Sequence, residues 1–230
     1  CGFNSIGIAS SGGAGRVTAE WMINGYMSED LFSLDIKRFQ KFHSSKKFIM
    51  ERVTETLGDL YGMHWPYKQH KTSREQRLLP YHDELEKAGA CFGVSGEYER
   101  PMWYALNGEK PEYKYSFDYQ NWYPSVEFET KNTITNIGLY DLSPFSKYEI
   151  KGEATHSELQ RICTANIKNE IGRSTYTQML NEAGGIETDL SIICIGENHF
   201  RIISSAATRT HDKAHILKHL SPKLKLKDIT

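Results

Sequence analysis

The stretch from Tyr176 to Leu190, YTQMLNEAGGIETDL, holds the carboxylate best placed to do chemistry, that of Asp189. Two apolar runs separated by a short segment with Gly184-Gly185 are typical of a β-hairpin. Because strand side chains alternate, the return strand sorts into two faces: Ile186, Thr188, Leu190 and Ile192 against Glu187, Asp189 and Ser191. In a groove, Asp189 could act as a general base, whereas on an open surface it would be a solvated strand residue. The alternation leaves both interpretations open.

A second candidate feature is the glycine-rich segment Ser10–Gly15, which the pattern places between a strand and a helix. The expected helix has one face made of Ala14, Val17, Thr18, Trp21 and Met22. Glycines let a backbone approach a ligand closely, and free N–H groups at a helix N-terminus favour negative charge. The spacing is not GxGxxG, so an ordinary strand–helix turn is the alternative.

The segment from about Ser45 to Glu112 combines one helix with a largely irregular remainder. The helix is expected over Lys46–Tyr61, with Ser44 or Ser45 as its cap and Gly62 as its stop. Glycines and prolines then interrupt the pattern repeatedly: Pro66, Pro80, Gly89, Gly93, Gly96 and Pro101. The three histidines of this stretch are too irregularly spaced to indicate convergent ligands: His64, His70 and His82. We therefore predict no metal site.

The last part of the chain, from about Tyr113, alternates helices with strands. Four aromatic residues near its start favour a packing role: Tyr119, Trp122, Tyr123 and Phe128. The expected order is a helix at 123–136, a strand at 139–150, a helix at 154–164, the hairpin at 174–195, a strand at 199–205 and a helix at 209–220. Short helices on one side of a mainly antiparallel sheet predict an α+β layer.

Composition excludes several classes of function. With 28 basic and 29 acidic residues in 230, bulk charge does not favour nucleic acid or a membrane surface, and no apolar run reaches membrane-spanning length. The four cysteines contain no CxxC pair, which fits a reducing compartment. The chain starts at Cys1 within an expected strand and ends on alternating lysines and leucines, so we expect a fragment.

Several segments together resemble one family. GLYDLSPFSKYEIKG (138–152), LQRICTANI (159–167), IGRSTYTQMLNEAGGIETDL (171–190) and FRIISSAATRTHD (200–212) resemble, in order and spacing, the glycine-cleavage T protein and its fused relatives, the dimethylglycine and sarcosine dehydrogenases. Upstream, ERVTETLGDLYGMHWP (51–66) and GACFGVSGEYERPMWY (89–104) resemble the middle segment of the FAD-containing members only.

The resemblance implies three regions. Residues 1–44 would be the C-terminal end of an FAD-dependent amine oxidoreductase domain with a strand–glycine turn–helix, 45–112 an irregular central linking domain, and 113–230 the N-terminal part of a T-protein-like folate domain with a truncated antiparallel sheet and helices. The cofactors would be FAD and tetrahydrofolate. Ser11, Gly12 and Gly13 would then be neighbours of the flavin.

The resemblance also implies roles on the folate side. Asp189 would lie beside the nitrogen that accepts a one-carbon unit, and Tyr176 and Gln178 would line the pterin slot. T proteins usually carry Asn at the position of Ser205, and its amide contacts the pterin. A hydroxyl is shorter and offers one donor in place of two, so the folate contact differs here.

The activity so implied is that of a flavin-dependent oxidoreductase acting on the CH–NH group of N-methylated glycines, with transfer of the one-carbon unit to tetrahydrofolate. The substrate would be a small N-methylated amine, with no nucleic acid or membrane partner. The location would be the cytoplasm in a bacterium or the mitochondrial matrix in a eukaryote. We expect this chain alone to be inactive. Two alternatives are a non-catalytic folate-binding or assembly module and a flavin-free folate-dependent methyltransferase or aminomethyltransferase.

Overall fold

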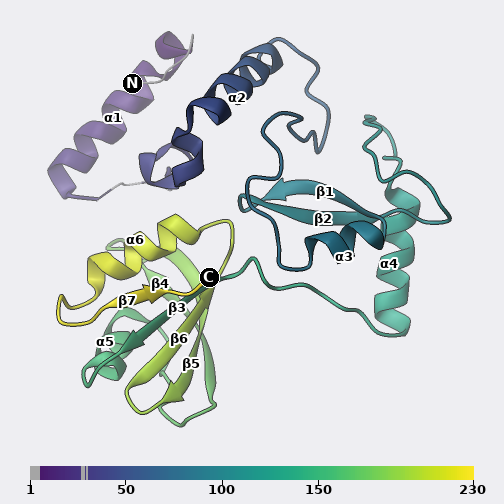
Figure 1. Ribbon diagram of the computed structural model, residues 1–230. Coiled ribbons are helices and arrows are strands. Elements are labelled where there is room, and N and C mark those ends of the chain that lie inside the picture. Colours follow the sequence, from purple (N-terminus) through teal and green to yellow (C-terminus); the bar gives the residue numbers. More distant parts are fainter. Residues whose placement is uncertain (1–5, 27–28, 30) are drawn as a thin grey trace. The chain divides into compact units, whose positions relative to one another are not determined.

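The computed structural model describes residues 6–26, 29 and 31–230 (Figure 1). The chain divides into two compact units, residues 1–40 and 41–230, and each is described by itself. Among the described residues, no helix is both long enough and apolar enough to cross a membrane.

The first unit contains helix α1 (Gly7–Asn24) and two short 3-10 helices, Phe32–Leu34 and Ile36–Arg38. Helix α1 ends at Gly25, whose backbone has φ of 78° and whose N–H bonds the carbonyl of Trp21. Only glycine adopts this left-handed conformation without strain, which makes it the usual residue after a helix.

The strand and glycine turn expected at the start are replaced by helix. Ser11, Gly12 and Gly13 lie inside α1, while residues 1–5 lie outside the described residues. The backbone is satisfied within the helix, as in the 3.0 Å bond from the N–H of Ser10 to the carbonyl of Ile6, whereas a strand would need a partner strand. The N–H groups of these glycines are therefore not arranged as an anion cradle at a helix start.

The second unit begins with a 3-10 turn, Lys41–Ser44, and helix α2 (Lys46–Asp59). The hydroxyl of Ser45 accepts a 3.2 Å bond from the N–H of Phe48, which confirms Ser45 as the N-cap. The end of α2 falls two residues before the predicted Tyr61.

The stretch expected to be irregular also contains helix α3 (His82–Lys87) and a hairpin of strands β1 (Ala90–Ser95) and β2 (Tyr98–Tyr104). Pro101 lies within β2 opposite Phe92, next to a break in the pairing register at Cys91/Phe92. Proline lacks an N–H donor and is tolerated in strands at edges and bulges, which explains why a residue taken as an interruption lies inside a strand. Helix α4 (Tyr123–Thr135) follows.

The C-terminal part forms a five-stranded antiparallel sheet in the order β4-β5-β6-β3-β7 (Figure 1). Its strands and helices are β3 (Ser146–Lys151), helix α5 (Thr155–Ile162), β4 (Ser174–Leu180), β5 (Ile186–Gly196), β6 (His199–Ser204), helix α6 (Arg209–His219) and β7 (Leu226–Asp228). Leu159 of α5 and Ile216 of α6 are fully buried in one cluster with sheet residues such as Ile192 and Ile202. The two helices therefore cover the same core, and the α+β layer is confirmed.

Strand β7 is short and is held at the edge of the sheet by an ion pair. Arg209 Nη2 lies 2.9 Å from Asp228 Oδ2, and the N–H of Thr230 donates to Asp228 Oδ1 at 3.2 Å. Burial alone would raise the pKa of Asp228, but these bonds outweigh it and lower the pKa to about 2. A depressed carboxyl pKa stabilises the fold above the unfolded-state value and stops doing so as pH falls through the folded value.

We expect Asp228→Asn to lower the free energy of unfolding by about 1–2 kcal/mol at pH 7, because the carboxyl pKa of about 2 lies well below its ordinary value and solvent weakens part of that effect. The difference from the unchanged chain should shrink between pH 4 and about pH 2 in urea denaturation. Glu127→Gln, which removes an exposed pair with Lys131 on α4, is the control and should leave the free energy of unfolding nearly unchanged. Equal stability of Asp228→Asn and the unchanged chain at pH 7 would contradict this role.

Candidate functional site

The β4–β5 hairpin brings three of the predicted residues together. Gln178 pairs with Asp189 across the two strands, and Tyr176 pairs with Ser191. Directly paired residues share a face of the sheet. The hydroxyl of Tyr176 donates a 2.8 Å hydrogen bond to Asp189 Oδ2. That bond raises the pKa of Tyr176, and it fixes one oxygen of the carboxylate.

Tyr176, Gln178 and Asp189 form a row on one face of the sheet, and Ser205, directly after β6, extends this row. Leu190 of β5 pairs with Ser204 of β6, so Ser205 follows at the level of Asp189. Its hydroxyl accepts a 3.2 Å bond from the N–H of Ala207, which keeps the side chain close to the end of the strand. Four residues predicted for the folate side thus lie together at one end of the sheet: Tyr176 on β4, Gln178 on β4, Asp189 on β5 and Ser205 directly after β6.

This row lies on the open face of the sheet. The opposite face carries Thr188, Leu190 and Ile192, each buried in the core, as the alternation predicted. Asp189 is exposed, and Tyr176 has 62% of its surface accessible. Neither of the two described cavities is lined by these residues. Asp189 therefore lies on a strand, as predicted, but on an open polar surface in place of the predicted groove. A ligand there would be covered by this chain from one side only.

Side-chain bonds shape the turn of this hairpin. Asn181 Oδ1 accepts from the N–H groups of Ala183 at 3.0 Å and Gly185 at 2.8 Å. Gly184 has φ of 83°, a conformation that side chains disfavour. The side chain of Asn181 therefore forms an Asx turn. Asn181 and Gly184 together set the conformation of the loop that connects β4 to β5.

Hydrogen bonds also connect the hairpin to helix α6, a contact that was not predicted from the sequence. His211 Nε2 lies 2.7 Å from Glu187 Oε2, and His211 Nδ1 lies 3.2 Å from Asp212 Oδ1. Asp212 is fully buried and accepts a 2.8 Å bond from Thr208 Oγ1. The bond to Asp212 raises the pKa of His211; burial opposes this and Glu187 supports it. Glu187 is two residues from Asp189, so this network positions the strand that carries the candidate base.

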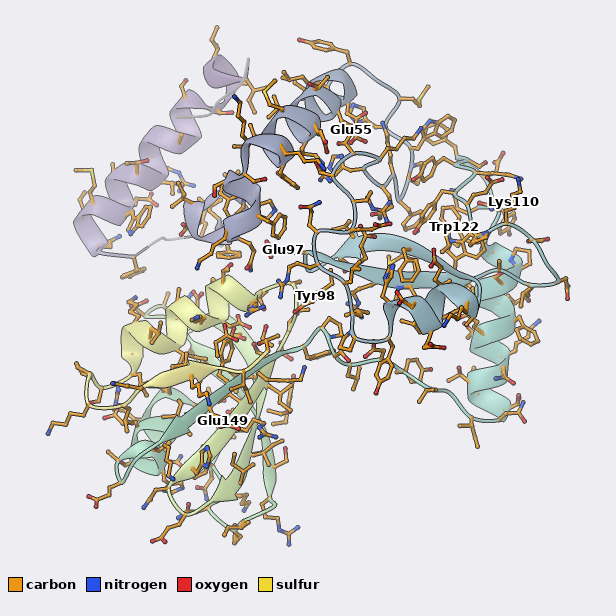
Figure 2. The ribbon with its side chains drawn as sticks, in the orientation of Figure 1. Glu55, Glu97, Tyr98, Lys110, Trp122 and Glu149 are labelled. Atoms are coloured by element: carbon orange, nitrogen blue, oxygen red, sulfur yellow. The ribbon has the colours of Figure 1, made fainter. Side chains whose placement is uncertain are left out.

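The open face continues toward the other end of the sheet with a second carboxylate. Glu149 of β3 (Figure 2) pairs across the strands with Arg201 of β6, and its Oε1 lies 2.6 Å from Arg201 Nη2. The bond from Arg201 lowers the pKa of Glu149. Glu149 is thus ion-paired with Arg201, whereas Asp189 accepts a hydrogen bond from the neutral hydroxyl of Tyr176.

A cluster of two carboxylates and a histidine lies on and beside helix α2. The metal-ligating atoms of Glu55 (Figure 2), Asp59 and His70 all lie within 4.8 Å of one another. Each carboxylate already has protein donors: Glu55 accepts from the N–H groups of Lys71 and Thr72, and Asp59 from Lys68 Nζ. Burial acts to raise the pKa of Glu55, but the hydrogen bonds lower it to about 2. The cluster therefore holds the 68–72 loop against α2, and the absence of a metal site stays a prediction.

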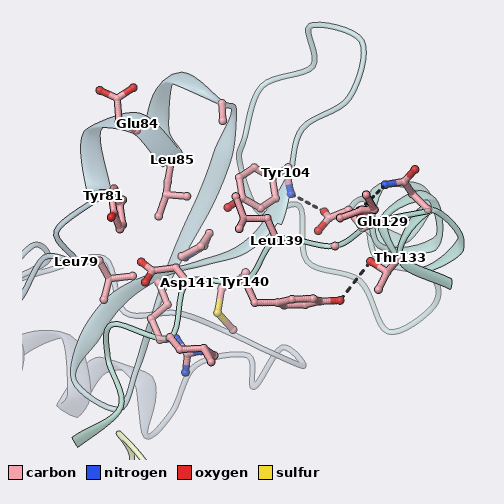
Figure 3. A pocket seen from close by; sticks show the side chains of 18 of the residues that line it. Leu79, Tyr81, Glu84, Leu85, Tyr104, Glu129, Thr133, Leu139, Tyr140 and Asp141 are labelled. Atoms are coloured by element: carbon pink, nitrogen blue, oxygen red, sulfur yellow. Dashed lines mark hydrogen bonds between the residues drawn. The ribbon is translucent and has the colours of Figure 1, made fainter. Parts of the chain in front are cut away.

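A cavity of about 930 Å³ lies between the β1–β2 hairpin with α3 and helix α4 (Figure 3). Its walls are mainly apolar, with Glu129 accepting a 3.0 Å bond from the N–H of Tyr104 and Tyr140 donating to Thr133. None of the residues predicted for flavin or folate lines it. The cavity is thus separate from the row that contains Asp189.

Comparison with protein families gives two matches, which cover residues 24–78 and 81–230. Residues 81–230 match the family described as the GCVT N-terminal domain. The chain belongs to this family. Residues 24–78 match the family described as the FAD dependent oxidoreductase central domain. The two matches meet between residues 78 and 81, whereas the boundary expected from the sequence lies at residue 112.

Three curated relatives of this GCVT-family chain match most of it. A 4-methylaminobutanoate oxidase (formaldehyde-forming) of Paenarthrobacter nicotinovorans is 37% identical over 94% of the chain and 26% of its own length. The mitochondrial pyruvate dehydrogenase phosphatase regulatory subunit of Mus musculus is 34% identical over 100% and 27%, and the mitochondrial dimethylglycine dehydrogenase of Rattus norvegicus 26% identical over 90% and 24%. The chain therefore spans about a quarter of the length of these relatives.

A solved structure supports the fold. The glycine cleavage system aminomethyltransferase T from Bartonella henselae superposes with a TM-score of 0.52 at 23% identity, over 66% of this chain and 38% of that one. The resemblance to T protein and to the dimethylglycine and sarcosine dehydrogenases is confirmed, and so is the α+β class.

Proposed function

We propose that this GCVT-family chain is the folate-side part of a flavin-dependent oxidoreductase that acts on an N-methylated amine and passes the one-carbon unit to tetrahydrofolate. The observation that carries the proposal is the row at the end of the sheet, where Asp189 is bonded by Tyr176 and paired with Gln178. The match of residues 24–78 to the FAD dependent oxidoreductase central domain supports the flavin half of the proposal.

The residues of the row fit a flat heteroaromatic ligand. Asp189 is ionisable and exposed, so its free oxygen can accept a proton from a ligand nitrogen while Tyr176 holds the other oxygen. The ring of Tyr176 offers an apolar surface beside this carboxylate. Gln178 adds an amide with both donor and acceptor groups on the same face. Ser205 supplies a hydroxyl where T proteins carry an amide, which predicts weaker or differently oriented pterin contacts.

The residues proposed to face FAD fit a packing role. Apart from the backbone of α1 itself, no atom of the described residues lies within 4 Å of a Cβ added at Gly12 or Gly13, so the helix surface there admits a close planar neighbour. Ser11 bonds its own helix, with Oγ donating to the carbonyl of Ile8 at 2.9 Å. When bound, FAD would supply the oxidation of the N-methyl group, and these residues would contribute one wall beside it.

A second candidate function is a non-catalytic regulatory module. The Mus musculus relative is named as a regulatory subunit and is 34% identical over the whole chain. The Asp189–Tyr176 pair favours the enzyme, because a module without chemistry has no need of an oriented carboxylate there. A flavin-free methyltransferase is disfavoured by the match to the oxidoreductase central domain.

The test uses the longer flavin-containing polypeptide that we propose includes this chain. Dimethylglycine, sarcosine and 4-methylaminobutanoate are added in turn under anaerobic conditions, and flavin bleaching is followed by absorbance. We expect one of these amines to bleach the flavin, and added tetrahydrofolate to divert the product from formaldehyde to methylenetetrahydrofolate. A protein that folds with FAD and is bleached by no amine would be the regulatory module instead. Bleaching with formaldehyde yield unchanged by tetrahydrofolate would remove the folate half of the proposal.

A further inference from the structure

Helix α6 carries three histidines at intervals of one turn: His211, His215 and His219. Residues four apart lie on one side of a helix, so the three imidazoles form a ladder. The ring centroids of His211 and His215 are 6.4 Å apart, and those of His215 and His219 are 4.7 Å apart with an interplanar angle of 55°. His215 and His219 are therefore the closer pair.

The histidines differ in what their nitrogens do. Both nitrogens of His211 are engaged, one by Glu187 and the other by Asp212. His219 Nε2 is buried and has no hydrogen-bond partner among the described residues. A buried polar atom without a partner is rare and calls for an explanation, of which an absent ion is one.

Burial and the neighbouring charges both act on His215 and His219. Burial is the largest effect that lowers the pKa of both His215 and His219. His219, His211 and Lys218 lower that of His215 further, and Lys218 and Arg161 lower that of His219, so both rings are neutral at pH 7 and offer a lone pair. Glu187 exerts a negative field on both. The neighbouring cations are already paired, Lys218 with Glu182 and Arg161 with Glu158.

Against the sequence-based prediction of no metal site, we propose that His215 and His219 bind one divalent transition-metal ion, with water completing the coordination. Imidazole is a preferred ligand of Zn²⁺, Ni²⁺ and Cu²⁺, and two histidines one helical turn apart can bind one ion together. With Zn–N bonds of about 2.0–2.1 Å, two rings on one tetrahedral ion have centroids roughly 5 Å apart. The observed 4.7 Å is close to that spacing. Because His219 Nε2 is buried, its ring must turn outward for a hydrated ion to reach it.

The other cluster with suitable residue types serves as the comparison. Glu55 and Asp59 beside His70 are already bonded by backbone N–H groups and by Lys68. A metal ion would have to displace those donors. The imidazoles of α6 have no such competitor at His219 Nε2, which makes them the better site.

The test is a calorimetric titration of the tag-free 230-residue chain with ZnCl₂ at pH 7.5, with Co²⁺ absorption as a second readout of coordination. We expect one ion per chain. His219→Gln and His215→Gln should each weaken binding by at least about tenfold. His70→Gln is the matched control and should leave the affinity unchanged.

Three results would overturn the site: no saturable uptake of Zn²⁺, loss of binding in His70→Gln with binding kept in His219→Gln, or affinity unchanged in both α6 variants. If circular dichroism shows that His219→Gln does not fold, the Zn²⁺ affinity of His215→Gln tests the site, because His215 is partly exposed. The readouts involve neither flavin nor folate, so their outcome is independent of the proposed activity.

Discussion

Replacing Asp189 by Asn in the longer flavin-containing protein should separate amine oxidation from folate product. Asn keeps the shape of the side chain and can still accept the bond from Tyr176, but it has lost the negative charge and the basicity. Flavin reduction by the amine should continue at its normal rate. Methylenetetrahydrofolate should fall by about two to four orders of magnitude, the range for losing an acid–base group. Formaldehyde should rise in its place, because the oxidised one-carbon unit then meets water first.

The matched control for this experiment is Glu149→Gln. Glu149 is also a strand carboxylate on the open face of the sheet, but it is bonded to Arg201 away from the Asp189 row. Its replacement should leave both product yields unchanged. If Asp189→Asn slowed flavin reduction and folate product equally, Asp189 would be structural. If neither changed, it would be the solvated strand residue that the alternation also allowed.

Local patterns were enough to predict the elements that surround this site. The period of two placed Leu190 and Ile192 in the core and Asp189 on the opposite face, as the structure has them. The cap at Ser45 was likewise readable, because capping depends on residues within one turn. Patterns of this kind succeed where the deciding interaction lies a few residues away.

The elements that were missed depend on distant partners. Glu187 and His211 are 24 residues apart, and no spacing rule connects a strand residue to a helix elsewhere in the chain. Strand β2 was hidden by Pro101, which is tolerated next to a break in the strand register that becomes visible only once β1 is paired. The openness of the surface at Asp189 could not be predicted either, since the covering of a sheet face is set by packing and not by alternation.

Arg74 and Glu99 form the ion pair whose loss should destabilise the fold most. Glu99 lies in β2 with 3% of its side chain exposed. Arg74 Nε donates to Glu99 Oε1 at 2.7 Å, its Nη2 donates to Oε2, and the N–H of Glu75 adds a bond of 2.8 Å. Arg74 Nη2 also reaches the carbonyl of Phe92 in β1 at 3.1 Å. Burial would raise the pKa of Glu99, and the bonds from Arg74 and Glu75 hold it below its usual value.

Arg74→Met keeps much of the side-chain volume and removes the charge, which leaves Glu99 buried and uncompensated. We expect the free energy of unfolding in urea to fall by about 3–5 kcal/mol at pH 7. Without Arg74, the folded-state pKa of Glu99 should rise above the unfolded value, so the loss should be smaller at pH 4 than at pH 7. The double variant Arg74→Met/Glu99→Gln should be more stable than Arg74→Met, because it no longer buries an unpaired carboxylate. Lys131→Met, from the exposed pair on α4, should leave the free energy of unfolding nearly unchanged. A loss in Arg74→Met that is independent of pH and unrelieved in the double variant would mean that packing of the long side chain, and not the paired charge, holds the 70–77 loop to the hairpin.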